Sequence, residues 1–184
     1  MRGGYAIPHL FKRGYKMGYF RFYRIQDPYV EYLHKWDSRV QLNKGERRPY
    51  IGIVLTVNDF NYFVPLESPK ENHVNIKSGG PVLKLDGGKL GIMGFNNMIP
   101  VKRNQLINFD IADEQEKQYQ MLLLNQLHYC AKHKDTILLR AQNTYAKAVG
   151  GVNPFYKRVC CDFRKLENAC RRYNPNRKHS KKNT

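Results

Sequence analysis

The sequence of 184 residues predicts a single α+β domain in which an antiparallel β-sheet is flanked by helices. Two β-rich runs joined by a short turn, at 51–57 and 62–64, predict a hairpin. Segment 72–101 places paired glycines between short apolar pieces, a composition typical of further short strands and loops. After Asp110, apolar residues recur at helical spacing. Most of the predicted strands therefore precede the long helices along the chain, as in an α+β fold.

The two ends of the chain are expected to lie outside the folded domain, which we predict to span residues 17–175. Residues 1–16 contain three glycines, one proline and four Lys or Arg without a regular period. We expect a flexible basic leader there, unless Met17 is the true first residue. Residues 176–184 are polar and basic, which predicts a disordered tail.

The folded part is predicted to begin with one strand and one short helix. A strand pattern runs from Tyr19 to Ile25. Asp27 is a favourable N-cap residue, and Pro28 suits the first helical position because its missing N–H has no partner there in any case. Val30 and Leu33 then recur at helical spacing, so a short helix is expected after Asp27.

The hairpin is expected to bring cations to a strand end. Its first run is mostly β-branched, and Asn58-Asp59 marks the turn. Pro65 and Pro69 are expected to end the second strand, because proline has no N–H to donate. Ser68 and Lys70 then lie at or just past the strand end. Close pairing of the two strands brings Arg47 and Arg48, which precede the first, to that same end.

Three helices are predicted in the C-terminal half. Asp113 followed by Glu116 resembles a capping box and predicts a helix over 113–133. A second periodic run follows Asp135 and is ended by Gly150-Gly151. Asp162 can cap a third helix with an apolar face and a strongly basic one.

The charge of the chain favours a polyanionic partner. It has 32 Lys and Arg against 15 Asp and Glu, a net charge of +17. No apolar run approaches the length of a membrane-spanning helix, and the cations are scattered over all parts of the chain. Nucleic acid is therefore favoured over a membrane surface. The four cysteines form no C-x-x-C pair and no export signal is recognisable, so we expect free thiols in a reducing cytoplasm.

The Ser68-Pro69-Lys70 segment is the predicted centre of chemistry. RNA cleavage without a metal requires an activated 2′-hydroxyl, stabilisation of charge on the reacting phosphate and protonation of the leaving oxygen. Lys70 and Arg48 can hold a phosphate, and Ser68 can position it by hydrogen bonding. His73 is an acid/base candidate, since its ordinary pKa lies near neutrality. The alternative is that this segment is only a turn and that His73 is a surface residue.

No metal or cofactor site is predicted. His128, Cys130 and His133 lie close together in the sequence, but residues two apart on a helix point away from each other. Only Cys130 and His133 can therefore share a helix face, which is too few ligands for a metal.

Several motifs in one order resemble the ToxN/AbiQ family of toxins from type III toxin–antitoxin systems. These motifs, which span roughly residues 19–173, are FRFYRI, YVEYL, PYIGIVL, VPLESPK, LGIMGFNNMIPV and LLLNQLHYC. The resemblance implies a metal-independent, sequence-selective endoribonuclease that leaves a 2′,3′-cyclic phosphate and serves phage defence or locus maintenance. It implies inhibition by a repeated RNA pseudoknot, in a closed assembly of toxin and RNA. It also implies a strongly twisted sheet similar to the Kid/MazF toxins.

The resemblance also implies roles for individual residues. The family's Ser-Pro-Lys corresponds to Ser68-Pro69-Lys70, its basic residue before the hairpin to Arg48, and its following histidine to His73. Glu67 stands where the family often has a hydroxyl residue, so the proton-transfer group is open between His73 and Glu67. The family's aromatic residue upstream of the basic position has no clear counterpart in 43–47.

Other cations are predicted to hold the RNA backbone. They are Arg47, Lys77, Lys102, Arg103, Arg140, Arg164, Arg171 and Arg172. The basic groove they form is expected to bind both the target mRNA and the antitoxin RNA. An RNA-binding module without turnover is the alternative function, because it requires the same basic surface but no Ser68 and Lys70 beside an acid/base group.

Overall fold

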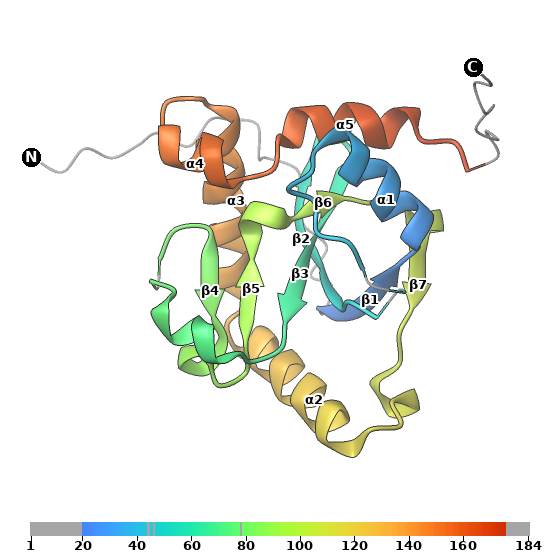
Figure 1. Ribbon diagram of the computed structural model, residues 1–184, viewed down its shortest axis with the longest axis vertical. Helices are drawn as coiled ribbons and strands as arrows, with labels where there is room; N and C mark the ends of the chain where they lie inside the picture. Colours follow the sequence, from blue (N-terminus) through green and yellow to red (C-terminus); the bar gives the residue numbers. More distant parts are fainter. Residues whose placement is uncertain (1–19, 44, 46, 78, 176–184) are drawn as a thin grey trace, which may run out of the picture.

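A seven-stranded antiparallel sheet forms the centre of the molecule (Figure 1). The computed structural model describes residues 20–175 except 44, 46 and 78. The predicted leader (1–16) and tail (176–184) lie outside the described residues. The strand order is β4-β5-β3-β2-β1-β7, and β6 also pairs with β3. The strands are β1 (Arg21–Ile25), β2 (Tyr50–Val57), β3 (Phe60–Glu67), β4 (Val82–Lys84), β5 (Ile92–Gly94), β6 (Ile99–Pro100) and β7 (Leu106–Asn108). This arrangement with flanking helices confirms the predicted α+β fold.

The predicted hairpin is formed by β2 and β3. Val57 pairs with Phe60, and the two turn residues Asn58 and Asp59 have φ of 46° and 68°. Both central residues in the left-handed region are typical of a type I′ turn, whose twist matches that of the strands. At the other end Tyr50 pairs with Pro65, so the residues just before β2 lie beside those just after β3.

Pro65 does not end the strand, contrary to the prediction. The Leu66 N–H donates to the carbonyl of Pro49 across the hairpin at 3.0 Å. Neighbouring residues face opposite edges of a strand, so the Pro65 nitrogen faces away from β2. On that side β3 pairs with β6 at Tyr62 and Phe63, and with β5 only from Leu66 onward. Proline thus occupies the gap between two partner strands, where no N–H is required.

The first helix begins at its predicted cap residue, one residue earlier than expected. β1 agrees with the predicted strand, and α1 (Asp27–Trp36) follows it. Asp27 is the first helical residue, and Gln26 occupies the N-cap position without a side-chain hydrogen bond. Asp27 therefore contributes its charge to the first turn, where the helix dipole favours an anion.

The long helices lie close to their predicted positions. They are α2 (Lys117–Lys132), α3 (Lys134–Val149) and α5 (Phe163–Arg172). The expected capping box of α2 is wrong, because Asp113 belongs to the 3-10 helix η6 (Ile111–Asp113) and Glu116 makes no capping hydrogen bond. The cap of α5 is confirmed: the Asp162 side chain accepts from the Lys165 N–H at 3.1 Å.

Several short elements were not predicted. β7 is only three residues long, and α4 (Pro154–Val159) is a helix of six. Asn153 caps α4 by accepting from the Phe155 N–H, and Pro154 takes the first helical position. The other 3-10 helices are η2 (Glu71–Asn75), η3 (Leu85–Gly88), η4 (Phe95–Asn97) and η5 (Arg103–Gln105).

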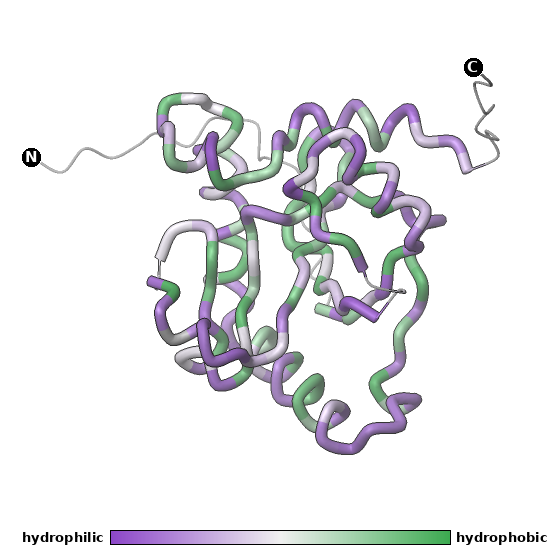
Figure 2. Tube along the Cα trace, in the orientation of Figure 1, coloured by the Kyte–Doolittle hydropathy of each residue, from purple (hydrophilic) through white to green (hydrophobic). Residues whose placement is uncertain are grey.

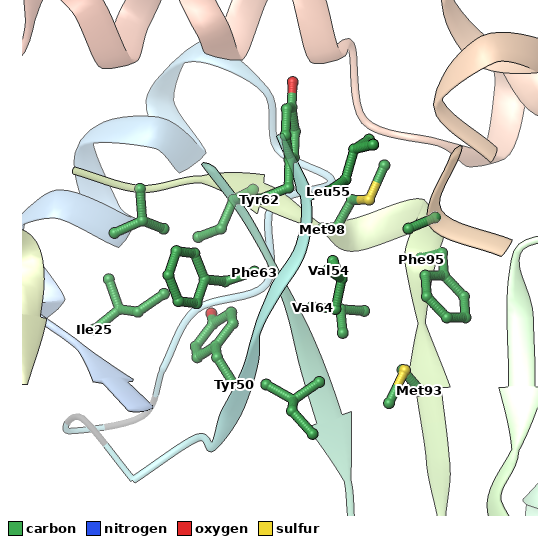
Figure 3. Close-up of a cluster of buried hydrophobic side chains, with 14 of the residues drawn as sticks. Ile25, Tyr50, Val54, Leu55, Tyr62, Phe63, Val64, Met93, Phe95 and Met98 are labelled. Carbon is green, nitrogen blue, oxygen red and sulfur yellow. The ribbon is translucent and has the colours of Figure 1, made fainter. Parts of the chain in front are cut away.

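The hairpin divides the hydrophobic core into two sides. Figure 3 shows Tyr50, Phe63 and Ile25 on one side of the hairpin, with Val64 and Phe95 on the other. Hydrophobic residues concentrate along the central strands, whereas much of α5 is hydrophilic (Figure 2). The apolar face of α5 packs on α1 and β6, so its basic face remains exposed.

The four cysteines are buried free thiols, as predicted. Burial raises the pKa of both the Cys130 and the Cys160 thiol to about 12. Because the thiolate is the reactive form, these side chains act as small apolar core residues.

Candidate functional site

The end of β3 exposes the Ser-Pro-Lys segment. Ser68, Pro69 and Lys70 follow the last strand residue, Glu67, and all three are exposed. Ser68 makes no side-chain hydrogen bond within the part of the chain that the structure describes. The pairing of Tyr50 with Pro65 brings the residues before β2 alongside, as predicted.

Glu67 connects three groups at this strand end. Its Oε2 accepts a hydrogen bond from Lys70 Nζ at 2.7 Å, and its Oε1 accepts one from Gln41 Nε2 at 3.1 Å. His73 Nε2 lies 3.9 Å from Glu67 Oε2. Arg48 is near enough for its charge to lower the pKa of Glu67. Two cations, a carboxylate and an imidazole therefore lie close together, and the exposed Ser68 is the residue that follows the carboxylate in the chain.

The Glu67 carboxylate is held in its ionised form. Partial burial by itself raises the pKa of this group, because it disfavours the charged state. The hydrogen bonds from Lys70 and Gln41, with the charges of Lys70 and Arg48, outweigh burial and bring the pKa below its ordinary value of 4.5. Glu67 is thus an anion at neutral pH.

His73 lies underneath this surface and is only 3% exposed. The helix η2 places His73 there, and the backbone N–H of His73 donates to the Lys70 carbonyl at 3.0 Å. Burial lowers the pKa of His73 below 6.5, and the positive charges of Lys70 and Lys84 lower it further, although Glu67 acts in the opposite direction. The ring is therefore neutral at pH 7. The alternative in which His73 is a surface residue is wrong.

Gly91 allows β5 to support the strand end. It has a φ of +92°, and a Cβ at this position would overlap the carbonyl oxygen of Glu67. Ile92 pairs directly with Glu67 in the β3–β5 ladder. The glycine thus allows the backbone of β5 to approach the Glu67 carbonyl closely, and this contact fixes the position of the strand end that leads to Ser68.

A family model described as "Toxin ToxN, type III toxin-antitoxin system" matches residues 21–171. This chain belongs to the ToxN family. It is similar to Endoribonuclease ToxN of Bacillus thuringiensis subsp. kurstaki, with 33% identity over 83% of this chain and 84% of the relative.

Two solved structures share the fold of this ToxN-family chain. One is a type III toxin that is selectively inhibited by a non-coding RNA pseudoknot; the TM-score is 0.73, with 33% identity over 84% of this chain and 97% of that one. The other is AbiQ, a lactococcal anti-phage endoribonuclease of the type III class. Its TM-score is 0.74, with 30% identity over 84% of this chain and 97% of AbiQ.

The predicted RNA-binding cations of this ToxN-family chain divide into separate groups. Arg171 lies over the ring of Phe60 at 5.2 Å, and Arg164 lies 3.3 Å from Glu167. Phe60 begins β3 and Glu67 ends it, so Arg171 and the Ser68 site lie at opposite ends of an eight-residue strand. At about 3.3 Å per residue this separation is about 23 Å. Arg171 therefore cannot touch the same phosphate as Lys70.

The remaining cations have varied surroundings. Arg47 and Lys77 are exposed, and they flank the segments that carry Arg48 and His73. Lys102 donates to the Arg171 carbonyl at 3.3 Å, which joins it to the α5 group with the adjoining exposed Arg172. Arg103 is exposed on η5. Arg140 donates to the carbonyls of Gly80 and Val82, so it supports the loop before β4.

The structure adds two residues that the sequence did not indicate. Gln41 binds Glu67 from the segment after α1, and Lys84 in β4 adds positive charge near His73. Neither belongs to a local motif, so only the fold brings them to the site. Among the described residues, no helix is long and apolar enough to cross a membrane, and no three His, Cys, Asp or Glu gather as a metal site.

Proposed function

We propose that this chain is the endoribonuclease toxin of a type III toxin–antitoxin system and that it cuts mRNA in the cytoplasm. Membership of the ToxN family supports this proposal, as do the endoribonuclease names of the relatives. The observation that carries it is the juxtaposition of Ser68, Lys70 and Glu67 at one exposed strand end.

In this proposal Lys70 and Arg48 stabilise the reacting phosphate. The scissile phosphate gains negative charge as the 2′-oxygen attacks the phosphorus, and cations fixed beside it are most effective at that moment. Arg48 is half-buried, and its Nε donates to the Leu42 carbonyl, which orients the guanidinium. The Ser68 hydroxyl donates a hydrogen bond to a phosphate oxygen and thereby positions the phosphate.

The Glu67–Lys70 pair supplies the proton transfers. Glu67 accepts the proton of the 2′-hydroxyl while the new O2′–P bond forms. Lys70 donates a proton to the 5′-oxygen while the P–O5′ bond breaks. The 2.7 Å hydrogen bond then returns the proton from Glu67 to Lys70, so both groups regain their starting states. The products are a 2′,3′-cyclic phosphate and a 5′-hydroxyl, with no net change in protons.

His73 acts through Glu67 in this scheme. Its burial keeps it from the RNA, and its Nε2 faces the Glu67 carboxylate at 3.9 Å. A neutral imidazole behind the carboxylate fixes the orientation of Glu67 without neutralising its charge. His73 is therefore a positioning residue.

An RNA antitoxin made of pseudoknot repeats is the proposed inhibitor and partner. The net charge of +17 suits a structured polyanion. The related type III toxin is inhibited by an RNA pseudoknot, and AbiQ is an anti-phage protein. We extend both features to this chain as a closed assembly of toxin and RNA that serves phage defence.

The test is growth inhibition together with RNA cleavage in vitro. Ser68→Ala and Lys70→Ala should each abolish toxicity at equal expression, while Lys132→Ala, an exposed lysine on α2, should remain toxic. Exposed positions usually change stability little, so thermal midpoints should match the wild type. A fully toxic Lys70→Ala would refute the site. RNA binding without cleavage by the wild type would favour the binding module.

A further inference from the structure

A cleft of about 1190 Å³ lies on the sheet away from the Ser68 site. Its floor comes from β1, β2, β3 and β7, and its walls come from α2 and the connection that leads from β7 to α2. Figure 1 shows that connection passing along one edge of the molecule down to α2. The volume is somewhat larger than the range of about 300–1,000 Å³ that is common for ligand pockets.

The floor of the cleft is aromatic. Phe22, Tyr23, Phe63 and Phe109 line it, and Arg24 holds the Phe109 ring with its guanidinium 4.2 Å from the ring centre. Gly52 makes room for Phe63, because a Cβ there would overlap the phenyl ring. Phe22 and Phe63 are buried, at 4% and 1% exposure, and form the base of the floor. Tyr23 and Phe109 are half-buried, so theirs are the rings that can stack on unpaired bases.

A register shift in β2 contributes to the same floor. The pairing moves from Ile51 with Val64 to Leu55 with Tyr62, so β2 has two more residues than β3 in this interval. Such a bulge redirects side chains. Ile53, within it, is 43% exposed and lines the cleft, opposite Leu124 of α2, which is 46% exposed.

Unpaired polar groups lie at the rim. Arg21 and Arg103 are exposed lining residues, and neither forms an ion pair within the described part of the chain. The Asn108 amide also has no hydrogen-bond partner there and can bind a base edge. One carboxylate lines the cleft, but Asp110 accepts from the Ala112 N–H at 2.9 Å. The rim therefore offers free cations and an amide.

The cleft lies on the same face of the sheet as Glu67. Side chains alternate along a strand, so Phe63 and Glu67, four residues apart on β3, project to one face. Four residues span about 13 Å. A single RNA strand can bridge that interval.

We propose that this cleft binds an unpaired segment of the RNA held by the toxin, with bases stacked on Tyr23 and Phe109 and phosphates bound by Arg21 and Arg103. The inference rests on the proposed function and adds a second RNA-binding site to it. Two unpaired arginines beside accessible aromatic rings favour an anionic ligand with flat bases, single-stranded nucleic acid, over a protein segment.

The experiment measures binding of a labelled decamer of 2′-O-methyluridine, which lacks the hydroxyl needed for cleavage. Asn108→Trp fills the cleft, and Asn125→Trp, on an exposed position of α2 outside it, is the matched control. Arg21→Ala and Arg103→Ala are compared with Lys132→Ala. A parallel series places one 5-iodouridine at successive positions and maps photo-crosslinks by mass spectrometry.

Asn108→Trp should weaken binding about tenfold, as expected for loss of about one stacked base, and Asn125→Trp should bind normally. Each arginine variant should reduce the slope of log affinity against log salt concentration by about one, as expected for the loss of one phosphate contact. Crosslinks should appear at Tyr23 or Phe109. Equal affinities for both tryptophan variants, or no binding by the wild type, would overturn the cleft site.

The proposed function is tested separately in the same preparations. If the wild type cleaves cellular RNA while Asn108→Trp binds and cleaves equally well, the cleft inference fails and the nuclease proposal stands. If no variant cleaves RNA but the crosslinks appear in the cleft, the nuclease proposal fails and the cleft stands. A protein segment that binds the cleft while the RNA decamer does not would also overturn the inference.

Discussion

The ammonium group of Lys70 lies 2.7 Å from Glu67 Oε2. In the sequence these two residues stand on either side of the exposed Ser68. The Lys70 side chain is 57% exposed, and pairs exposed to this degree contribute little to stability. The contact therefore matters for orientation. It holds a mobile lysine next to the serine, where an incoming phosphate can share it with the carboxylate.

The first prediction concerns Glu67→Gln. The amide keeps the size of the side chain but can no longer accept the 2′-proton or pair with the lysine charge. Single-turnover cleavage should fall by about a hundredfold or more, as is typical of a lost general base, with little change in RNA affinity. The control is Asp86→Asn, in an exposed pair with Lys89 at 3.9 Å. Wild-type cleavage by Glu67→Gln would eliminate Glu67 as the proton acceptor.

The effect of Glu67→Gln on cleavage should depend on whether Lys70 is present, which a double variant with Lys70→Ala tests. If the two residues act as a unit, the double variant should lose little more activity than the more severe single variant. Single-turnover rates for all four proteins, at saturating enzyme, give the coupling directly. Rate losses that multiply would mean that the residues act independently.

A second prediction separates chemistry from binding. Lys70→Ala should slow cleavage far more than it weakens RNA affinity, because its contact strengthens as charge develops on the phosphate. Arg171→Ala and Arg172→Ala, at the other end of β3, should weaken binding and reduce the salt slope by about one per lost phosphate contact, with the saturated rate nearly unchanged. The measurements are single-turnover cleavage and equilibrium binding across a salt series. Equal losses of rate and affinity for Lys70→Ala would contradict this division.

A third prediction concerns the support of the site by Gly91. Gly91→Ala places a methyl group against the Glu67 carbonyl in addition to the strain of a positive φ. Gly87→Ala has a similar strain, with a φ of +64°, but open space around it. Gly91→Ala should therefore lower the unfolding free energy by at least about 2 kcal/mol more than the control and should reduce cleavage. Chemical denaturation measures the difference, and equal losses would show that the contact with β3 is unimportant.

A fourth prediction follows from the lowered pKa of His73. The unfolded chain binds a proton at this residue below about pH 6.5, whereas the folded protein resists doing so. Stability rises with pH wherever the unfolded state binds more protons, so acidification through this range should destabilise the protein. The lowered pKa of Glu67 also makes acid destabilising, but only below about pH 4.5. His73→Gln should flatten the dependence between about pH 7 and about pH 5.

The control for this measurement is His128→Gln, which changes an exposed histidine on α2. Urea denaturation at several pH values gives the unfolding free energies. His128→Gln should follow the wild-type profile. An unchanged slope in His73→Gln would mean that another group is responsible for any loss of stability in acid.

Local patterns in the sequence were sufficient to predict much of the fold. The β-branched run before Asn58-Asp59 predicts the hairpin, and Asp162 predicts the start of α5, because turn and cap preferences depend on a few neighbouring residues. The predicted capping box was wrong because Asp113 belongs to η6 whereas Glu116 precedes α2. The prediction that Pro65 ends its strand was wrong for a related reason. Whether a missing N–H matters depends on which strand lies opposite, and β5 and β6 are distant in sequence.

The sequence by itself determined the net charge of the chain and indicated the segment of the candidate site. Ser68, Lys70 and Arg48 were recognisable because strand pairing brings the two ends of one hairpin together, and the motifs resemble the ToxN family. Only the tertiary structure decided what surrounds them. Gln41 reaches Glu67 from another segment, and His73 is buried. Hydrogen bonds and burial depend on three-dimensional proximity, so the ionisation of Glu67 and the neutrality of His73 follow from the folded arrangement and not from residue order.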